Sequence, residues 1–292
     1  MPAELRADPA PAGRWLSIVG IGEDGIAGLG ETAKAHVAGA EIVFGGARHL
    51  DLAAPLIRGQ ARAWPSPFDL EPLLALAGRK VCALASGDPL FFGVASSLLK
   101  HLPADEMEVV PAPSAFSLAA ARLGWPLAET EKLSLHGKAI PRLRPFLQPY
   151  CRLLCLTSDA ASPGVIAAYV ERLGFGPSPF FVLEALGGPR ERIRATTAQD
   201  FALADVHPLN IVGIDVTAGP GARILPRAPG LPDDLFDNDG QLTKREVRAV
   251  TLSALAPRRG ELLWDIGAGA GSVAIEWMLA DPSMKATAIE AD

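Results

Sequence analysis

Two glycine-rich turns, each directly after an apolar run, are the parts of this chain best suited to hold a ligand. The first is Gly20-Ile21-Gly22-Glu23-Asp24-Gly25, and the second is Asp265-Ile266-Gly267-Ala268-Gly269-Ala270-Gly271. Because glycine has no Cβ, such turns let a ligand approach the backbone closely. An ordinary strand-to-helix turn also explains the first pattern, so its interpretation depends on support from elsewhere in the chain.

That support comes from further loops that follow apolar runs. Ser86-Gly87-Asp88-Pro89 comes after the run 80–85, and Pro113-Ser114-Ala115 and Leu156-Thr157 follow later runs. Asp88 is the first candidate for a catalytic side chain, either orienting its loop or transferring a proton. The alternative is structural, because Asp before Pro commonly forms an Asx turn.

Apolar runs of strand length alternate with helical patterns along the chain, which predicts an α/β fold. A Pro-, Gly- and Arg-rich stretch at 219–231 has the composition of a linker. Residues 189–197 are expected to form a hairpin arm. We expect strands at 15–20, 41–44, 80–85, 107–110, 152–157, 180–184, 210–216, 261–265 and 285–290, and helices at 27–38, 91–101, 114–123, 162–174, 197–204, 243–255 and 271–279.

Composition excludes several classes of function. The chain has 292 residues and a formal net charge of −6, so no global field attracts nucleic acid or a membrane surface. Its three cysteines have neither disulfide-framework nor zinc-site spacing, and we expect no metal. Residues 1–13 lack a signal-peptide pattern, and no stretch approaches the ~20 apolar residues of a membrane span. We therefore expect a soluble, cytoplasmic protein.

The ordered set of loops resembles the tetrapyrrole (corrin and porphyrin) methyltransferase family. The segments 41–50, 86–92 and Leu135-His136-Gly137 are most similar to the branch that acts on precorrin-6Y, and the resemblance covers residues 15–216. It implies two α/β lobes with S-adenosylmethionine in the cleft between them, a corrin precursor as substrate, and a homodimer. Methyl transfer from a sulfonium is a direct displacement, so such a site chiefly supplies alignment and exclusion of water.

The resemblance also implies roles for particular residues. Glu23 stands where many family members have proline. Arg48, Arg142 and Arg144 are candidates for binding substrate carboxylates, as are the arginines 190, 192 and 194, although a solvated surface role is open for each. His49 and His136 are either bases or structural residues. The expected cofactor-binding residues are Gly22, Glu23, Gly87, Asp88, Pro89, Ser114, Ala115, Thr157, Leu186 and Asn210.

The second turn resembles the opening of a class I S-adenosylmethionine methyltransferase, in which Glu290 would bind the ribose hydroxyls. A nicotinamide-binding fold is the alternative, but its motif is Gly-x-Gly-x-x-Gly. Thr243 would contact the donor, form a capping box with Glu246, or do both. The expected cofactor residues of this second, incomplete site are Thr243, Asp265, Gly267, Gly269, Gly271 and Glu290.

The predicted organisation is a two-lobed tetrapyrrole methyltransferase domain at 14–216, with lobes 14–137 and 138–216, a linker at 217–232, and at 233–292 the start of a Rossmann-like class I domain. Two strands and two helices cannot bury both faces of a parallel sheet, so the second domain is expected to be incomplete. The resemblance implies C5 methylation of precorrin-6Y in cobalamin biosynthesis by the first domain. It assigns C15 methylation and C12 acetate decarboxylation to the second. The alternatives are another tetrapyrrole acceptor, or a donor-binding protein that is inactive without its missing half.

Overall fold

The structure is a computed structural model that describes residues 13–291, so the expectations for residues 1–12 lie outside it. The chain divides into two compact units. Unit 1 comprises the chain up to Arg142 together with Pro149–Pro220, and unit 2 comprises Leu143–Gln148 with Gly221–Asp292. Strands and helices alternate as expected, and the predicted α/β class is confirmed. No helix in the described part of the chain is long and apolar enough to cross a membrane.

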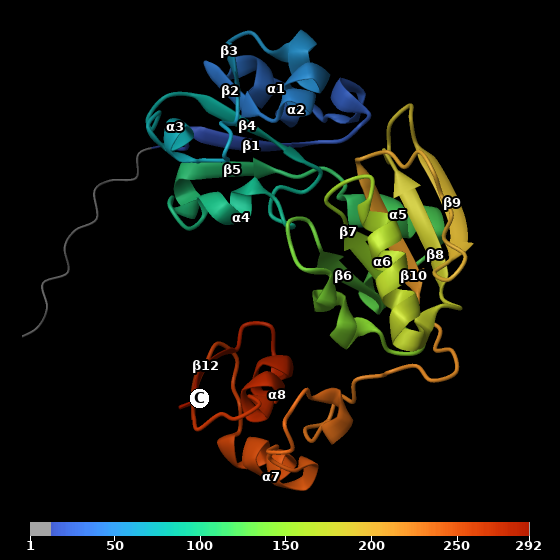
Figure 1. The fold of residues 1–292 in the computed structure, drawn as a ribbon. Helices are drawn as coiled ribbons and strands as arrows, with labels where there is room; N and C mark the ends of the chain where they lie inside the picture. Colours follow the sequence, from blue (N-terminus) through green and yellow to red (C-terminus); the bar gives the residue numbers. More distant parts are fainter. Residues whose placement is uncertain (1–12, 292) are drawn as a thin grey trace, which may run out of the picture. The chain divides into compact units, whose positions relative to one another are not determined.

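The first sheet of unit 1 is parallel, with strand order β3-β2-β4-β1-β5 (Figure 1). Alternate residues of β1 enter two separate apolar clusters: Leu16 and Ile18 pack on one face, and Val19 and Ile21 on the other. Helices α1 and α2 contribute to the second cluster and α3 and α4 to the first, so both faces are covered, as parallel sheets require. The elements are β1 (Leu16–Ile21), α1 (Glu31–Gly39), β2 (Ile42–Gly45), α2 (Ala47–Ala53), β3 (Gln60–Ala63), α3 (Glu71–Leu74), β4 (Val81–Ser86), α4 (Val94–Leu98) and β5 (Met107–Val110).

The second sheet of unit 1 is mixed, with strand order β6-β7-β10-β8-β9 (Figure 1). Only β6 and β7 are parallel, and the predicted hairpin arm is confirmed as β9, antiparallel to β8. Phe116 and Ala119 of α5 pack on Leu154, Leu183 and Ile211 of this sheet. The elements are α5 (Ala115–Leu123), β6 (Thr130–Ser134), β7 (Arg152–Leu156), α6 (Ser162–Val170), β8 (Pro179–Glu184), β9 (Arg192–Thr197) and β10 (Asn210–Asp215).

Of the predicted helices, one is much shorter in the structure and one is absent from the residues that it describes. The helix expected at 91–101 spans only Val94–Leu98, because Phe92 has a φ of +60°, which a right-handed helix cannot contain. The helix expected at 197–204 is absent from the described chain. Thr197 Oγ1 instead donates to Asp200 Oδ2 at 2.5 Å, and Arg194 Nη1 donates to the Ala204 carbonyl at 2.7 Å. These contacts hold the segment in a turn followed by irregular chain.

Unit 2 contains α7 (Arg245–Leu255), β11 (Leu262–Ile266), α8 (Ser272–Ala280) and β12 (Lys285–Ile289), with β11 parallel to β12. The fully buried Arg248 of α7 donates to Glu276 of α8 at 2.7 Å. Glu276 also accepts from the backbone N–H groups of Gly230 and Leu231, at 2.7 and 2.9 Å. The guanidinium carbon of Arg248 lies 4.4 Å from the Phe236 ring centroid. This buried cluster fixes the segment before α7 against both helices.

The expected capping box at the start of α7 is wrong. The N-cap residue is Lys244, and no side chain caps the helix. The carbonyl of Thr243 instead accepts a hydrogen bond from Arg248, which draws this residue toward the buried cluster. Tertiary contacts therefore override the local Thr-x-x-Glu signal at this position.

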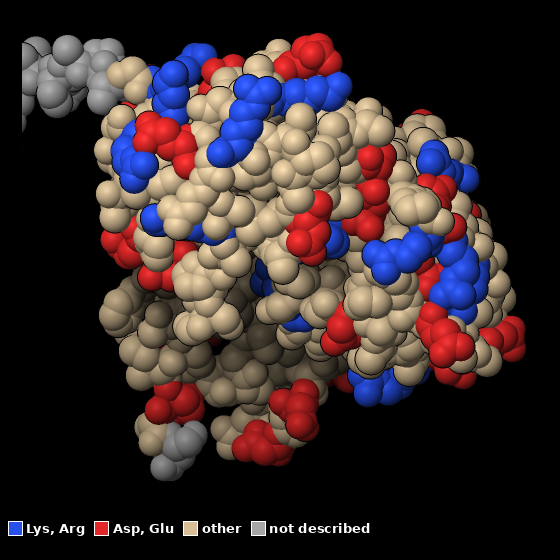
Figure 2. All heavy atoms as spheres, turned by 90° about the horizontal axis from the view of Figure 1, so that it is seen from above, with Lys and Arg blue, Asp and Glu red and all other residues tan. Residues whose placement is uncertain are grey.

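Charged side chains of both signs are dispersed over the face shown in Figure 2. Figure 2 shows Lys and Arg interspersed with Asp and Glu over the face it presents, with no extended region of one sign. This agrees with the modest net charge of −6. Recognition of an anionic ligand therefore depends on local groups rather than on the overall field.

Candidate active site

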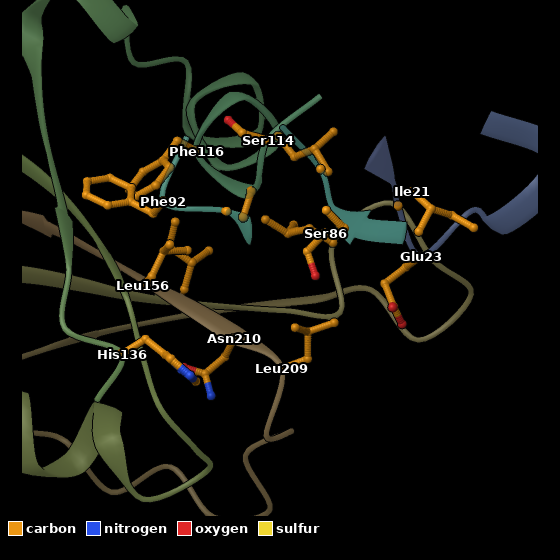
Figure 3. Close-up of a pocket in the computed structure, with 18 of the residues that line it drawn as sticks. Ile21, Glu23, Ser86, Phe92, Ser114, Phe116, His136, Leu156, Leu209 and Asn210 are labelled. Carbon is orange, nitrogen blue, oxygen red and sulfur yellow. The ribbon is translucent and has the colours of Figure 1, made fainter. Parts of the chain in front are cut away.

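A pocket opens at the carboxyl ends of β1 and β4, where Ile21 lies opposite Ser86 (Figure 3). The chain after β1 enters a helix on one face of the sheet, and the chain after β4 enters a helix on the other face. Ligands of parallel α/β sheets bind where neighbouring connections diverge in this way. The second sheet supplies the opposite wall, including Leu156, Leu183 and Ile211. The cavity measures about 420 Å³, within the range of roughly 300–1,000 Å³ typical of small-molecule sites.

Glycines allow the loops around the pocket to approach one another. A Cβ on Gly20 would lie 1.9 Å from the Gly87 carbonyl oxygen, so no side chain fits there. Gly87 has a φ of +58°, and a Cβ on it would lie 2.9 Å from the carbonyl oxygen of Pro113. The loops after β1, β4 and β5 therefore meet through main-chain atoms. This part of the pocket wall is backbone rather than side chain.

Glu23 occupies the opposite end of the pocket from Phe92 (Figure 3). Its side chain is 8 % exposed and forms an ion pair with Arg48, which also lines the pocket. Arg190, on the loop after β8, lies 3.8 Å from Glu23 Oε2. A Cβ on Gly188 would lie 2.6 Å from the Glu23 Cβ, so the absence of a side chain permits this approach. Glu23 and Arg48, predicted as donor and substrate ligands, bind each other.

His49 is held as a neutral ring beside this ion pair. Arg48 Nη2 lies 2.8 Å from His49 Nε2, and because a guanidinium has only donors, we assign Nε2 as the acceptor and place the ring proton on Nδ1. Nδ1 is buried and has no hydrogen-bond partner among the described residues. Burial, and then the charge of Arg48, lower the pKa of His49 to about 4. Ser86 Oγ accepts from Arg48 Nη2 at 2.9 Å and donates to His49 Nε2 at 2.8 Å.

Two further features complete the wall. The N-cap residue Ser114 accepts a hydrogen bond from the Ser117 N–H at 3.1 Å, and its helix α5 begins at Ala115 beside the pocket. Thr157 Oγ1 lies 2.7 Å from Asn210 Oδ1, which ties the end of β7 to the start of β10. Asn210 Nδ2 donates to the carbonyls of residues 159 and 207, at 3.0 and 2.8 Å. The polar groups of Thr157 and Asn210 thus position the backbone that faces the pocket.

Most of the predicted first-site residues converge on this pocket, although Asp88 and Pro89 do not line it. The Asp88 carboxylate accepts from the Leu90 N–H at 2.9 Å, the contact of an Asx turn. Arg142 and Arg144, within the 3-10 segment Ile140–Phe146, also lie outside the lining, so their role in carboxylate binding stays a prediction. The predicted residues that line the pocket are Gly22, Glu23, Arg48, His49, Gly87, Ser114, Ala115, His136, Thr157, Leu186 and Asn210.

Comparison with known proteins identifies the family. Residues 16–202 match the tetrapyrrole (corrin/porphyrin) methylases. A precorrin-6Y C(5,15)-methyltransferase (decarboxylating) of Sinorhizobium sp is 54% identical over 98% of this chain and 70% of its own length. The chain belongs to the tetrapyrrole methylases. The corresponding enzyme of Mycobacterium tuberculosis is 37% identical over 95% of this chain and 70% of its own length.

A solved structure supports the same assignment. The cobalamin biosynthesis precorrin-6Y methylase of Archaeoglobus fulgidus is 28% identical, with a TM-score of 0.54 over 70% of this chain and all of that one. The predicted resemblance is thus confirmed, and the tetrapyrrole methylase described here is an S-adenosylmethionine-dependent methyltransferase.

The second glycine-rich turn lies in unit 2, where residues 234–292 match a precorrin methyltransferase domain. Asp265 Oδ2 is buried and has no partner among the residues described. Glu290 Oε2 accepts from the Gly269 N–H at 2.6 Å, and this hydrogen bond is the main cause of its lowered pKa. The Gly267 N–H donates to the carbonyl of Ile289 at 2.8 Å. The turn is therefore bound to the end of β12 at two points, and the predicted residues 265, 267, 269 and 290 lie close together.

Sequence reasoning did not find the aromatic end of the pocket, formed by Phe91, Phe92 and Phe116. It also gave no role to Ser86, whose hydroxyl bonds to Arg48 and His49. The Phe91-Phe92 pair was visible in the sequence, but its helical assignment concealed that one ring is left exposed. No local signal marks Phe116, which reaches the pocket only through the packing of α5.

Proposed function

We propose that unit 1 of this tetrapyrrole methylase transfers a methyl group from S-adenosylmethionine to C5 of precorrin-6Y in cobalamin biosynthesis. The observation that carries the proposal is the pocket at the divergence of β1 and β4, which is partly walled by backbone and is lined mostly by residues of the segment that matches the family. The substrate is inferred from the activity of the relatives that align over nearly the whole chain.

The residues present fit such a donor. Gly20 and Gly87 let the loops after β1, β4 and β5 pack main chain against main chain, so backbone borders this part of the pocket, and the pocket is of small-molecule size. The N-terminus of α5 offers unpaired N–H groups and a partial positive charge, which suit a carboxylate. We propose that Gly22, Gly87, Ala115 and the backbone at Leu186 contact the donor. Thr157 and Asn210 would hold the pocket's shape.

S-adenosylmethionine supplies a methyl group already activated on a sulfonium. The protein's own contribution is alignment and exclusion of water, for which apolar walls and main-chain groups suffice. His49 is neutral at pH 7, so it adds no cation to the wall where a sulfonium would bind. A catalytic role for Asp88 stays a prediction, since its carboxylate is engaged within its own loop.

We further propose that residues 14–216 are the C5-methylating domain, that 217–232 connect it to the next, and that a class I methyltransferase domain begins at 233. We assign C15 methylation and loss of the C12 acetate carboxyl to that domain. Its donor-binding residues would be Thr243, Asp265, Gly267, Gly269, Gly271 and Glu290. The match of residues 234–292 to a precorrin methyltransferase domain supports this assignment. Homodimer formation is a separate prediction, which sedimentation equilibrium would test.

Calorimetric titration with S-adenosylhomocysteine, followed by mass spectrometry of precorrin-6Y incubated with S-adenosylmethionine, tests the proposal. We expect binding and a mass gain of one methyl group, with fragmentation placing the methyl at C5. Titration with NADH is the control for the nicotinamide alternative and should give no heat. Binding without any mass gain would favour a silent donor-binding protein, and methylation of only a different tetrapyrrole would correct the substrate.

A further inference from the structure

Phe92 places a large apolar ring at one end of the pocket without burying it. The side chain lines the pocket and is 49 % exposed. Its ring stacks on Phe91 with centroids 5.0 Å apart, and lies 5.8 Å from the ring of Phe116, which is fully buried (Figure 3). The three rings form a continuous aromatic wall that ends in an open ring. An apolar ring left half in water gains only part of the burial energy available to it.

The backbone of Phe92 is also strained. Its φ of +60° lies in the left-handed region, which is costly for a bulky residue. The following Gly93 closes the turn so tightly that a Cβ on it would lie 2.4 Å from the Pro89 carbonyl oxygen. Holding this ring at the pocket therefore lowers stability in two ways, through backbone strain and through exposure of an apolar side chain. Such costs persist where a ligand uses the group.

A cation lies near the exposed ring. Lys138, an exposed residue on the turn after β6, holds its Nζ 5.6 Å from the Phe92 ring centroid. In the described part of the chain it forms no ion pair with a carboxylate. Its long side chain is free to leave the ring for a stronger partner, because an exposed cation–π contact is worth only ~0.5–1 kcal/mol. The loop after β4 and the turn after β6 thus bring together a flat apolar face and a mobile positive charge.

We propose that Phe92 and Lys138 form a positioning subsite for the acceptor macrocycle. The ring of Phe92 stacks on the conjugated face of the tetrapyrrole, and Lys138 pairs with a carboxylate on its rim. The inference rests on the proposed function and extends it by naming the groups that orient the acceptor. Neither residue transfers a proton or a methyl group. Both act by fixing the plane of the acceptor relative to the donor.

The test compares Phe92→Gly, Phe92→Leu and Phe92→Tyr. The probe is uroporphyrin, a flat tetrapyrrole with carboxylates on its rim, and its binding is followed by fluorescence. We expect Phe92→Gly to weaken uroporphyrin binding by about 5- to 20-fold. Its melting temperature should be unchanged or higher, because glycine relieves the positive φ. Phe92→Leu should weaken binding nearly as much, whereas Phe92→Tyr should stay within about 2-fold of wild type. The affinity for S-adenosylhomocysteine should not change in any of them.

Lys138→Met tests the proposed ion pair between Lys138 and a carboxylate of the acceptor. It should weaken uroporphyrin binding several-fold at low salt and reduce the salt dependence of binding, with the exposed Lys100, outside the pocket lining, replaced in Lys100→Met as the matched control. The inference is overturned if Phe92→Gly and Phe92→Leu bind uroporphyrin like wild type, or if wild type itself does not bind it. A fall in melting temperature and in S-adenosylhomocysteine affinity together would assign Phe92 a merely structural role, and would also overturn it. Wild type that binds neither ligand would refute the proposed function as well.

Discussion

Replacing His49 by Gln should make unit 1 less sensitive to acid. The folded protein holds the pKa of His49 at about 4, chiefly through burial, whereas an unfolded chain has the ordinary value near 6.5. Between these values the unfolded chain binds a proton that the folded protein does not. Protonation of the unfolded state therefore favours unfolding as the pH falls from about 6.5 to about 4. Each pH unit in this window costs about 1.4 kcal/mol, or about 3 kcal/mol in all.

Gln is the matched replacement because its amide oxygen can occupy the place of Nε2 and accept from Arg48 and Ser86. It also removes the buried ring nitrogen that has no partner among the described residues. The lowered carboxyl pKa values of Glu184 and Glu191 add their own loss of stability at low pH. Those losses occur in both proteins, so they cancel in the comparison.

The assay is urea-dependent hydrogen exchange, read by mass spectrometry in peptides that cover β1 and β4. A local readout is needed because a chain with two units need not unfold in one transition. Exchange rates are corrected for their intrinsic pH dependence. The stability of His49→Gln relative to wild type should rise by about 3 kcal/mol from pH 7 to pH 4. A difference that stays constant across this range would show that His49 is not buried as a neutral ring.

Three further substitutions probe other parts of the protein. Gly87→Ala, at a φ of +58° and without room for a Cβ, should destabilise unit 1 by about 1–3 kcal/mol and weaken S-adenosylhomocysteine binding in calorimetry. Thr157→Val leaves Asn210 Oδ1 without its hydrogen-bond donor and should lower the free energy of unfolding by about 1–3 kcal/mol. An unchanged midpoint in urea unfolding would contradict this. Arg248→Met leaves the buried Glu276 without its charge partner and should lower the stability of unit 2 by about 3–5 kcal/mol. Hydrogen exchange should show lost protection in α7 and α8, while β1 and β4 stay protected.

The strands that carry the pocket could be predicted because their signals are local. β1 and β4 are continuous apolar runs followed by glycine, and both were expected within a residue of their observed bounds. β3 was not expected, since Gln60–Ala63 is an exposed edge strand without apolar periodicity. The same limit applies to residues 197–204, whose conformation depends on Arg194 and on a turn at Thr197 rather than on helix propensity.

Most of the residues expected at the first site line the pocket, but the interactions among their side chains were not predicted. The resemblance placed Glu23 near the donor and Arg48 near the substrate, each by its own motif. Their ion pair depends on how the loop after β1 approaches the first turn of α2, and the motifs carry no information about that approach. The neutral state of His49 follows from the same packing, because burial and then the charge of Arg48 lower its pKa. Charge states in the site are thus properties of the assembled loops.

The pocket also stands out by the local rules that it breaks. His49 buries a ring nitrogen that has no partner among the described residues, and Phe92 and Ala185 line the same cavity with positive φ values of 60° and 44°. Each of these features lowers the stability of the folded protein. Strained or unsatisfied groups of this kind are expected at sites where function requires them. Their convergence on one cavity, between loops distant in sequence, is evidence for a functional site that does not depend on any relative. It also implies that variants relieving these costs should gain stability as they lose binding, the opposite of what damage to a structural core would produce.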